Sequence, residues 1–300
     1  MELPIYTVDA FTTHPFEGNP AAVCIIKHDQ DVDPSIMQSI AKEMNLSETA
    51  FVQLLNPSVE SVDKVFGLRW FTPTIEVNLC GHATLASAAV LFHHYAHLCD
   101  HLVKFKTLSG ILTAKNEHGQ ITLDLPLADC TSQVSKTADS VIQKVLLEFN
   151  SSIQTSHVKA YYSPMTKKLL IRLPDECSRS QLESFPVPEA SNLLKTHDGT
   201  DIKGVIVTVL GGGADKDKRP YDFVSRYFAP WVGIPEDPVT GSAHTVLGKY
   251  WSEVLSTPHL YARQCSSRGG NLLLTVDEKS GRLFVAGKAC IVLTGKFILP

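Results

Sequence analysis

Arg69-Trp70-Phe71-Thr72-Pro73 recurs in the second half of the chain as Arg226-Tyr227-Phe228-Ala229-Pro230, at an offset of 226 − 69 = 157 residues. Three further pairs of segments follow in the same order: Gly81-His82-Ala83 with Gly241-Ser242-Ala243, Gly110-Ile111-Leu112 with Gly270-Asn271-Leu272, and Gly119-Gln120-Ile121 with Gly281-Arg282-Leu283. Colinear matches at nearly constant spacing indicate a duplicated chain. The repeat therefore predicts two similar halves.

Each copy of the repeat has the pattern of a strand ending in Phe-x-Pro, a loop, a helix and a hairpin with glycine at its turn. The helices expected after Gly81 and Gly241 are apolar over wide arcs, which is typical of buried helices. We therefore expect an α+β fold of two similar domains, each a curved sheet wrapped around a central helix, related by a pseudo-two-fold repeat. Pro126 and the polar residues after it break the pattern and mark the boundary.

The composition is that of a soluble globular chain. Of its 300 residues, 44% are hydrophobic and 19% are charged, and this length favours two domains. The formal net charge of −4 gives no broad positive field, so neither nucleic acid nor an anionic membrane is an expected partner. The N-terminal residues do not resemble a secretory signal, and the longest apolar stretch is too short to span a bilayer. We expect a cytoplasmic protein.

The cysteines are odd in number and scattered. There are seven of them, and no two form a Cys-x-x-Cys pair. This spacing argues against a disulfide framework and against a structural zinc site. We therefore expect reduced thiols and no metal.

Glu48 is the candidate acid/base. The run from Leu46 to Val52 alternates as a strand does, so Glu48 shares a face with Leu46, Ala50 and Val52. A carboxylate on an apolar face is either paired or has its pKa raised, and a raised pKa lets it hold a proton near neutral pH as a general acid/base requires. The pattern alone leaves open a solvent-exposed glutamate at a strand end.

Two helix starts form a second candidate constellation. Gly81-His82 and Gly241-Ser242 stand where the first N–H groups of a helix lack partners, and such groups commonly bind a carboxylate or phosphate. Asp237 adds a carboxylate before the second helix, and it is expected to be extended because Pro238 follows it. The alternative is structural: the glycines allow tight turns, His82 caps its helix and Asp237 belongs to a turn.

Several of these segments resemble the signature segments of the phenazine-biosynthesis PhzF-like family. The matching segments are Asn45–Phe51, Cys80–Thr84 and Glu236–Ala243, and Asp9–Phe11 with Gly18–Val23 matches the start of the family. The resemblance covers the whole chain in the expected order. It implies the diaminopimelate epimerase fold, with the site between domains 1–128 and 129–300. In relatives of that fold the last strand crosses back to the first domain. Whether the strand expected from Ala289 to Leu299 does the same is left open.

The resemblance also implies an activity, which is a proton shift on a small carboxylate-bearing substrate without metal or cofactor. It assigns Glu48, in domain 1–128, as the acid/base. It assigns His82, Asp237 and Ser242 to substrate positioning or proton relay, and the N–H groups of Gly81 and Gly241 to the substrate carboxylate. Because family members often form homodimers, a second copy of the chain is a candidate partner.

Two other functions are weighed against this isomerase. A catalytically idle small-molecule-binding or regulatory protein could use the same cleft. A cysteine-dependent epimerase is disfavoured, because relatives of this fold that racemise amino acids use two facing thiols. The repeat partner of Cys80 is Thr240 or Asp237, and neither is a cysteine. Cys80 stays a minor candidate for a reactive thiol at a helix start.

Overall fold

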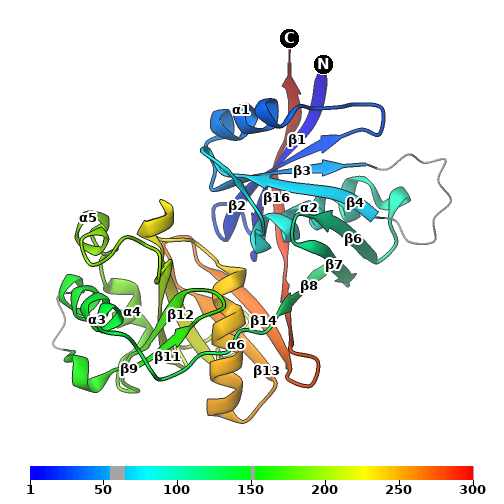
Figure 1. Ribbon diagram of the computed structural model, residues 1–300. Helices are drawn as coiled ribbons and strands as arrows, with labels where there is room; N and C mark the ends of the chain where they lie inside the picture. The colour runs from blue at the N-terminus through cyan, green and yellow to red at the C-terminus, as the bar shows by residue number, and fades with distance from the viewer. Residues whose placement is uncertain (55–64, 150–152, 300) are drawn as a thin grey trace. The chain divides into compact units, whose positions relative to one another are not determined.

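The computed structural model describes the chain except residues 55–64, 150–152 and 300 (Figure 1). It divides into two compact units. Unit 1 is Met1–Leu125 together with Phe284–Pro300, and unit 2 is Pro126–Leu283. The first division lies beside Pro126, close to the predicted boundary at 128. At the other end, residues 284–300 cluster with unit 1, whereas the predicted second domain extended to residue 300.

Unit 1 is built on one curved sheet with strand order β16-β1-β2-β3-β4-β6-β7-β8. The last strand, β16, pairs antiparallel with β1 (Figure 1). The last strand of the chain therefore returns to the first domain, a point that the sequence alone left open. The pairs β2/β3 and β4/β6 are parallel, and β3/β4, β6/β7 and β7/β8 are antiparallel. The bounds are β1 (Glu2–Ala10), β2 (Asn19–Ile26), β3 (Glu48–Gln53), β4 (Val65–Phe71), β5 (Glu76–Val77), β6 (Leu102–Thr107), β7 (Gly110–Glu117), β8 (Gln120–Pro126) and β16 (Ala289–Ile298).

Helix α1 (Pro34–Met44) lies between β2 and β3 in the sequence. The carboxylate of Asp33 caps the helix by accepting a hydrogen bond from Ser35 N at 2.8 Å. Asn45 ends it in the left-handed conformation, with φ at 49°. The buried face of α1 packs with β1, β2, β3 and β4 in one apolar core.

Helix α2 (Gly81–His94) is the central helix of unit 1 and packs against β1, β2, β3, β7 and β16. Every residue from His82 to Leu91 is buried, as expected for a helix that is apolar on most sides. Its internal hydroxyls bond to the helix backbone, since Thr84 Oγ1 donates to Cys80 O and Ser87 Oγ donates to Ala83 O. The 3-10 turn η1 (Ala96–Leu98) follows.

Unit 2 repeats this construction. Its sheet has the order β14-β13-β12-β11-β10-β9, and β15, most of which belongs to unit 1, follows β14 after a turn containing Gly281. Helix α6 packs against β13 and β14, and α3, α4 and α5 contribute to the same apolar core as β10, β11 and β12. The bounds are α3 (Lys136–Glu148), η2 (Thr155–His157), β9 (Lys159–Ser163), β10 (Lys168–Arg172), α4 (Arg179–Ser184), α5 (Ala190–Leu194), β11 (Gly204–Leu210), β12 (Phe223–Phe228), η3 (Pro230–Val232), α6 (Gly241–Leu255), β13 (His259–Gln264), β14 (Gly270–Asp277) and β15 (Arg282–Gly287).

The pairing pattern confirms the duplication. Strands β10/β11 are parallel like β2/β3, and β11/β12 are antiparallel like β3/β4. The next pairs match as well, because β12/β13 are parallel like β4/β6 and β13/β14 are antiparallel like β6/β7. The central helix follows the same strand in each unit, α2 after β4 and α6 after β12. The two-unit α+β fold expected from the repeat is therefore present.

One local prediction was wrong in detail. The strand expected from Leu46 begins at Glu48, and it is buried on both faces rather than alternating with solvent. The reason is that α1 and α2 both pack against β3. Phe51 belongs to the core under α1 and meets Phe71 edge to face at 5.5 Å. Glu48 therefore lies in a covered strand.

None of the helices in the described part of the chain has the length and apolar character needed to cross a bilayer.

Candidate active site

Glu48 is the first residue of β3 and its side chain is buried, with 8% of the residue exposed. Burial raises the pKa of the Glu48 carboxyl above its ordinary value, and the nearby polar side chains of Ser47 and Cys80, which favour the charged form, oppose that rise in part. The environment of Glu48 thus favours a carboxyl that keeps its proton to a higher pH than a solvated glutamate does.

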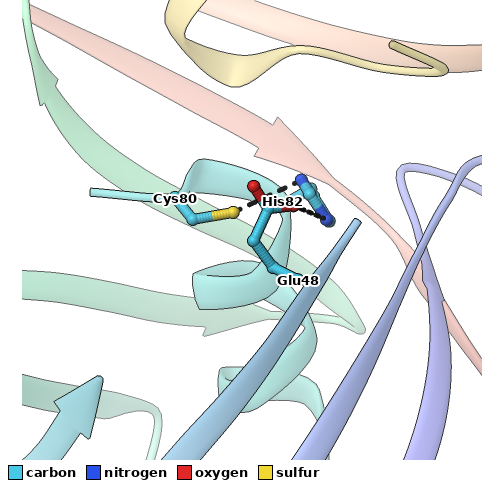
Figure 2. A group of neighbouring side chains, drawn as sticks. All are labelled: Glu48, Cys80 and His82. Carbon is cyan, nitrogen blue, oxygen red and sulfur yellow. Dashed lines mark hydrogen bonds and ion pairs between the residues drawn. The ribbon is translucent and has the colours of Figure 1, made fainter. Parts of the chain in front are cut away.

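His82, in the first turn of α2, lies against this carboxyl (Figure 2). Its Nε2 is 3.3 Å from Glu48 Oε2 and 3.3 Å from Ser47 Oγ. The contact with Glu48 is within ion-pair distance, but Oε2 makes no hydrogen bond among the described residues. A buried carboxylate oxygen without a hydrogen bond favours the neutral acid.

Cys80 completes the group on the other side of the imidazole ring. Its Sγ lies 3.4 Å from His82 Nδ1, so the two ring nitrogens of His82 face a thiol and a carboxyl respectively (Figure 2). A neutral imidazole donates from one nitrogen and accepts at the other. Cys80, His82, Ser47 and Glu48 therefore form a continuous polar path on which a proton can move.

These side chains also have the chemistry of metal ligands. One ligand atom from each of Glu48, Cys80 and His82 can be chosen so that all lie within 4.8 Å of one another, and all three residues are buried. Thiolate, imidazole and carboxylate are the donors that zinc takes in proteins. Cysteine spacing could not reveal this trio, because only one cysteine contributes to it.

The start of α2 lacks a side-chain cap. Gly81 is the first helical residue, and the side chain of the N-cap residue Cys80 makes no capping hydrogen bond to a backbone N–H of the helix. The loop before it is held by a two-pronged pair, in which Arg69 Nε and Nη2 lie 2.7 and 2.8 Å from the oxygens of Glu76. Ser109 Oγ also donates to Asn78 O at 2.8 Å. The loop is thereby fixed while its helical N–H groups receive no cap from the side chain of Cys80.

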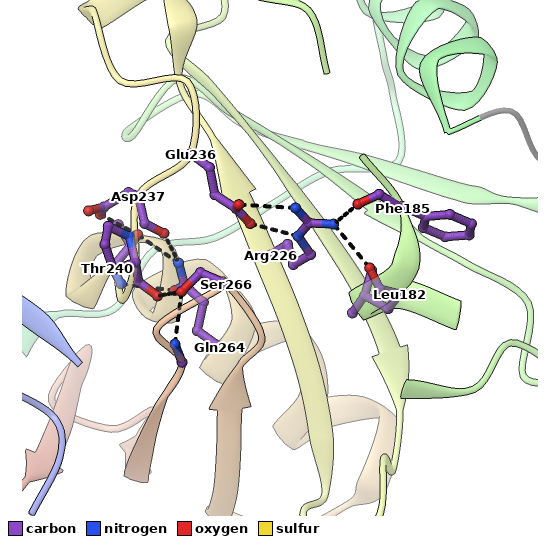
Figure 3. Close-up of polar contacts among 10 residues, drawn as sticks. Leu182, Phe185, Arg226, Glu236, Asp237, Thr240, Gln264 and Ser266 are labelled. Carbon is purple, nitrogen blue, oxygen red and sulfur yellow. Dashed lines mark hydrogen bonds and ion pairs between the residues drawn. The ribbon is translucent and has the colours of Figure 1, made fainter. Parts of the chain in front are cut away.

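Asp237, Gly241 and Ser242, the remaining predicted residues, lie in unit 2 at the start of α6. Asp237 is 7% exposed, and its Oδ2 accepts a hydrogen bond of 2.5 Å from Thr240 Oγ1 (Figure 3). Gly241 is the first residue of α6 and is buried, whereas Ser242 is half-buried. The N-cap residue Thr240 makes no side-chain cap, so this helix start resembles that of α2.

Gln264 and Ser266 hold the loop that carries Asp237 (Figure 3). Gln264 donates from Nε2 to Asp237 O at 2.6 Å and accepts from Thr240 N at 2.9 Å. Ser266 Oγ donates to Pro238 O at 2.8 Å. Asp237 and the start of α6 are consequently fixed by residues that follow them by more than twenty positions, which no local sequence signal could show.

The loop supports are repeated in the two units. Arg226 binds Glu236 through Nε and Nη2, at 2.6 and 3.0 Å, as Arg69 binds Glu76. Ser266 takes the place of Ser109, since each donates to a backbone carbonyl of the loop before the central helix. Arg226 is the more buried arginine and also donates to the carbonyls of Leu182 and Phe185 (Figure 3).

The structure thus brings Glu48, Gly81 and His82 together in unit 1 and places Asp237, Gly241 and Ser242 around one helix start in unit 2. Sequence reasoning gave Ser47 no role and kept Cys80 only as a minor candidate. Period two puts Ser47 on the opposite face from Glu48, but Ser47 precedes the strand and is not bound by that alternation. The position of Cys80 directly before a helix was the available signal for the thiol.

The chain is similar to known proteins over nearly its whole length. The family model described as phenazine biosynthesis-like protein matches residues 8–295. A phenazine biosynthesis-like domain-containing protein of Bos taurus is 49% identical, over 98% of this chain and 99% of the relative. An uncharacterized isomerase of Halalkalibacterium halodurans is 40% identical over 100% of both chains. The crystal structure of a PhzF family protein of Enterococcus faecalis is similar with a TM-score of 0.79, at 36% identity and full coverage of both chains.

Proposed function

The chain belongs to the phenazine biosynthesis-like protein family, and from this premise we propose that it is an isomerase that moves a proton on a small carboxylate-bearing substrate. The similarity to a relative named as an isomerase supports the reaction type. The observation that carries the proposal is the burial of Glu48 against His82, Ser47 and Cys80. Such a carboxyl is suited to take up and return a proton near neutral pH.

In the proposed reaction Glu48 acts in both directions. As a carboxylate it removes a proton from a substrate carbon, and as a carboxylic acid it returns a proton to another atom of the same substrate. Burial, the main cause of its raised pKa, makes the carboxylate a stronger base and lets the acid form persist at higher pH. One residue can therefore perform both half-reactions without a cofactor.

His82 is proposed to assist Glu48. With Nε2 at 3.3 Å from the carboxyl and Nδ1 at 3.4 Å from the thiol of Cys80, it can orient the carboxyl and relay a proton. Ser47 is the alternative hydrogen-bond partner of the same ring nitrogen, at 3.3 Å. A small movement of the imidazole between Ser47 and Glu48 would change how strongly the carboxyl holds its proton.

The open helix starts are proposed to bind the substrate carboxylate. Neither Cys80 nor Thr240 caps its helix with a side chain, so the N–H groups at Gly81 and Gly241 are suited to an anion. Ser242 and Asp237 stand beside the second of these starts and would position the polar groups of the substrate. The hydrogen bonds of Gln264 to Asp237 O and Thr240 N hold this loop in place, which favours a binding role.

Solvent deuterium exchange tests this function whichever product the reaction forms. Small amino- and hydroxycarboxylates would be incubated with the protein in D₂O, and incorporation of deuterium at carbon would be followed by mass spectrometry. Glu48→Gln should lower the exchange rate by about 10² to 10⁴ with the fold intact, because it removes the ionisable proton and little else. Ser242→Ala should have a milder effect.

The matched control is Glu43→Gln, on the exposed side of α1, which should exchange like the wild type. Exchange by Glu48→Gln at the wild-type rate would refute the assignment of Glu48. Absence of exchange by the wild type with every carboxylate, together with retained binding of one of them, would instead favour an idle binding protein.

A further inference from the structure

Lys168, the first residue of β10, is a buried cation that the proposed reaction does not use. Only 7% of the residue is exposed, and its Nζ lies over the ring of Tyr227, 5.6 Å from the centroid. No hydrogen bond from this ammonium to another residue in the described part of the chain is found. A lysine ammonium has three donors, and lysines are rarely buried this far unless they are paired.

The surroundings of Lys168 do not neutralise it fully. Burial lowers its pKa to about 8, Asp237 opposes that fall through its charge, and Lys203 adds to it. Burial of the charged ammonium therefore destabilises the folded protein. Groups with a perturbed pKa concentrate at functional sites, because a bound ligand can offset the cost of burying a charge that lacks a hydrogen-bond partner in the protein.

Tyr227, over whose ring the head of Lys168 lies, occupies the space beside the neighbouring strand. Its partner across the parallel pair β10/β11 is Gly204, which has no side chain. The space that a Cβ would need at Gly204 is filled by Tyr227, whose hydroxyl oxygen would lie 2.2 Å from it. The carbonyl of Tyr227 accepts a hydrogen bond from Asp237 N at 3.0 Å. Lys168, Tyr227 and Asp237 thus form one group inside unit 2, connected to the loop that starts α6.

The repeat gives this group a counterpart in unit 1. There, Glu48 of β3 pairs with Ala21 of β2. In unit 2 the corresponding strands β11 and β10 pair Gly204 with Lys168. The offset 204 − 48 = 156 agrees with the offset of 157 at Arg69 and Arg226. Gly204 of unit 2 therefore stands at the position of Glu48 in unit 1. The buried cation Lys168 lies opposite Gly204, on the neighbouring strand β10.

We propose that Lys168 is an anion-binding residue whose ammonium, on the face of Tyr227, binds the carboxylate of a small amino- or hydroxycarboxylate. The carboxylate supplies the acceptors that the ammonium lacks, and an amino or hydroxyl group of the same ligand can donate to Asp237. The inference rests on the proposed function only in taking this ligand to be the substrate of the same protein. The ammonium of Lys168 would add a full positive charge to the partial positive charge at the start of α6.

The test compares Lys168→Met with Lys203→Met in the full chain. Lys203 is the matched control, because it is an exposed lysine whose charge acts on Lys168. Binding of benzoate, with benzamide as the neutral analogue, is measured by calorimetry. Lys168→Met should weaken benzoate binding by about 10- to 100-fold, the loss expected for a charge-assisted hydrogen bond, and leave benzamide unchanged. Lys203→Met should change either affinity by less than about threefold.

Two further measurements separate binding from a structural role. Benzoate affinity of the wild type should fall as the pH rises past about 8, where the ammonium faced by Asp237, Lys203 and Tyr227 loses its proton, and this fall should be absent in Lys168→Met. The unfolding temperature of Lys168→Met should equal or exceed that of the wild type, because a buried charge has been removed.

Three results would overturn the inference: no benzoate binding by the wild type, unchanged binding in Lys168→Met, or weaker binding accompanied by a lower unfolding temperature. The last would show that Lys168 is a structural counter-ion of Asp237. Failure of the isomerase proposal is distinguishable, since it would abolish deuterium exchange and leave the Lys168-dependent binding of benzoate in place. Glu48→Gln should bind benzoate as the wild type does if only the reaction depends on Glu48.

Discussion

The two arginine–glutamate pairs of the repeat provide an internal experiment on burial. The perturbation is Glu236→Gln in unit 2, compared with Glu76→Gln in unit 1. The geometry is nearly the same, with Nε to carboxylate distances of 2.6 and 2.7 Å. The environments differ, because the side chains of Arg226 and Glu236 are 5% and 10% exposed, whereas those of Arg69 and Glu76 are 34% and 25% exposed.

Burial decides the expected magnitudes. Removing the carboxylate from a buried pair leaves an uncompensated guanidinium, which costs about 3 to 5 kcal/mol. Arg226 cannot turn to solvent, since its Nη1 also donates to the carbonyls of Leu182 and Phe185. Arg69 is partly solvated, so loss of its partner should cost about 0 to 1 kcal/mol. We therefore expect a difference of at least about 2 kcal/mol between two chemically identical substitutions.

The assay should report on each unit separately, because unfolding of a chain with two units need not be two-state. Native-state hydrogen exchange gives an opening free energy for the amides of β11 and β12 in unit 2 and of β3 and β4 in unit 1. Glu236→Gln should lower the values in unit 2 and leave those in unit 1 unchanged. Equal losses in the two variants, or a loss below about 1 kcal/mol for Glu236→Gln, would refute the reasoning from burial.

Two further substitutions test the sites. Since the pKa of Glu48 is raised above its ordinary 4.5, its protonation contributes stability that is present below that value and is lost as the pH rises through the folded-state pKa. Glu48→Gln should therefore gain stability relative to the wild type as the pH rises above 4.5 in urea unfolding, and a pH-independent difference would contradict this. Gly204→Ala should cost about 1 to 3 kcal/mol, because the new Cβ would overlap the buried ring of Tyr227, whereas Gly295→Ala, with no atom closer than 3.9 Å, should not destabilise the protein. Equal unfolding midpoints for these two glycine variants would contradict the packing argument.

Local signals in the sequence predicted the elements around the site. Asp33 followed by Pro34 is a typical helix start and Asn45 is a typical helix end, and the glycines at 119 and 281 marked the hairpin turns. The wide apolar arc of α2 predicted its burial. These signals work because caps, turns and helical periodicity depend on residues a few positions apart.

Contacts between distant segments could not be predicted in this way. Burial of β3 on both faces depends on two helices, one on each side of it in the sequence. Lys168 follows Lys167 before an apolar run and has the pattern of a solvated charge at a strand start. Its burial arises from Gly204 and Tyr227, which lie far along the chain. The thiol of Cys80 likewise meets Glu48 only because β3 and α2 pack together.

The pairing of β16 with β1 has a consequence for synthesis on the ribosome. The sheet of unit 1 is built from both ends of the chain, and the whole of unit 2 is made between them. At about 5 to 20 residues per second, roughly 15 to 60 s pass between the synthesis of β1 and that of β16. During this interval unit 2, being continuous, can complete its fold, while β1 keeps an unpaired edge that invites pairing with another nascent chain. The half of the protein that is translated first is thus the half that matures last.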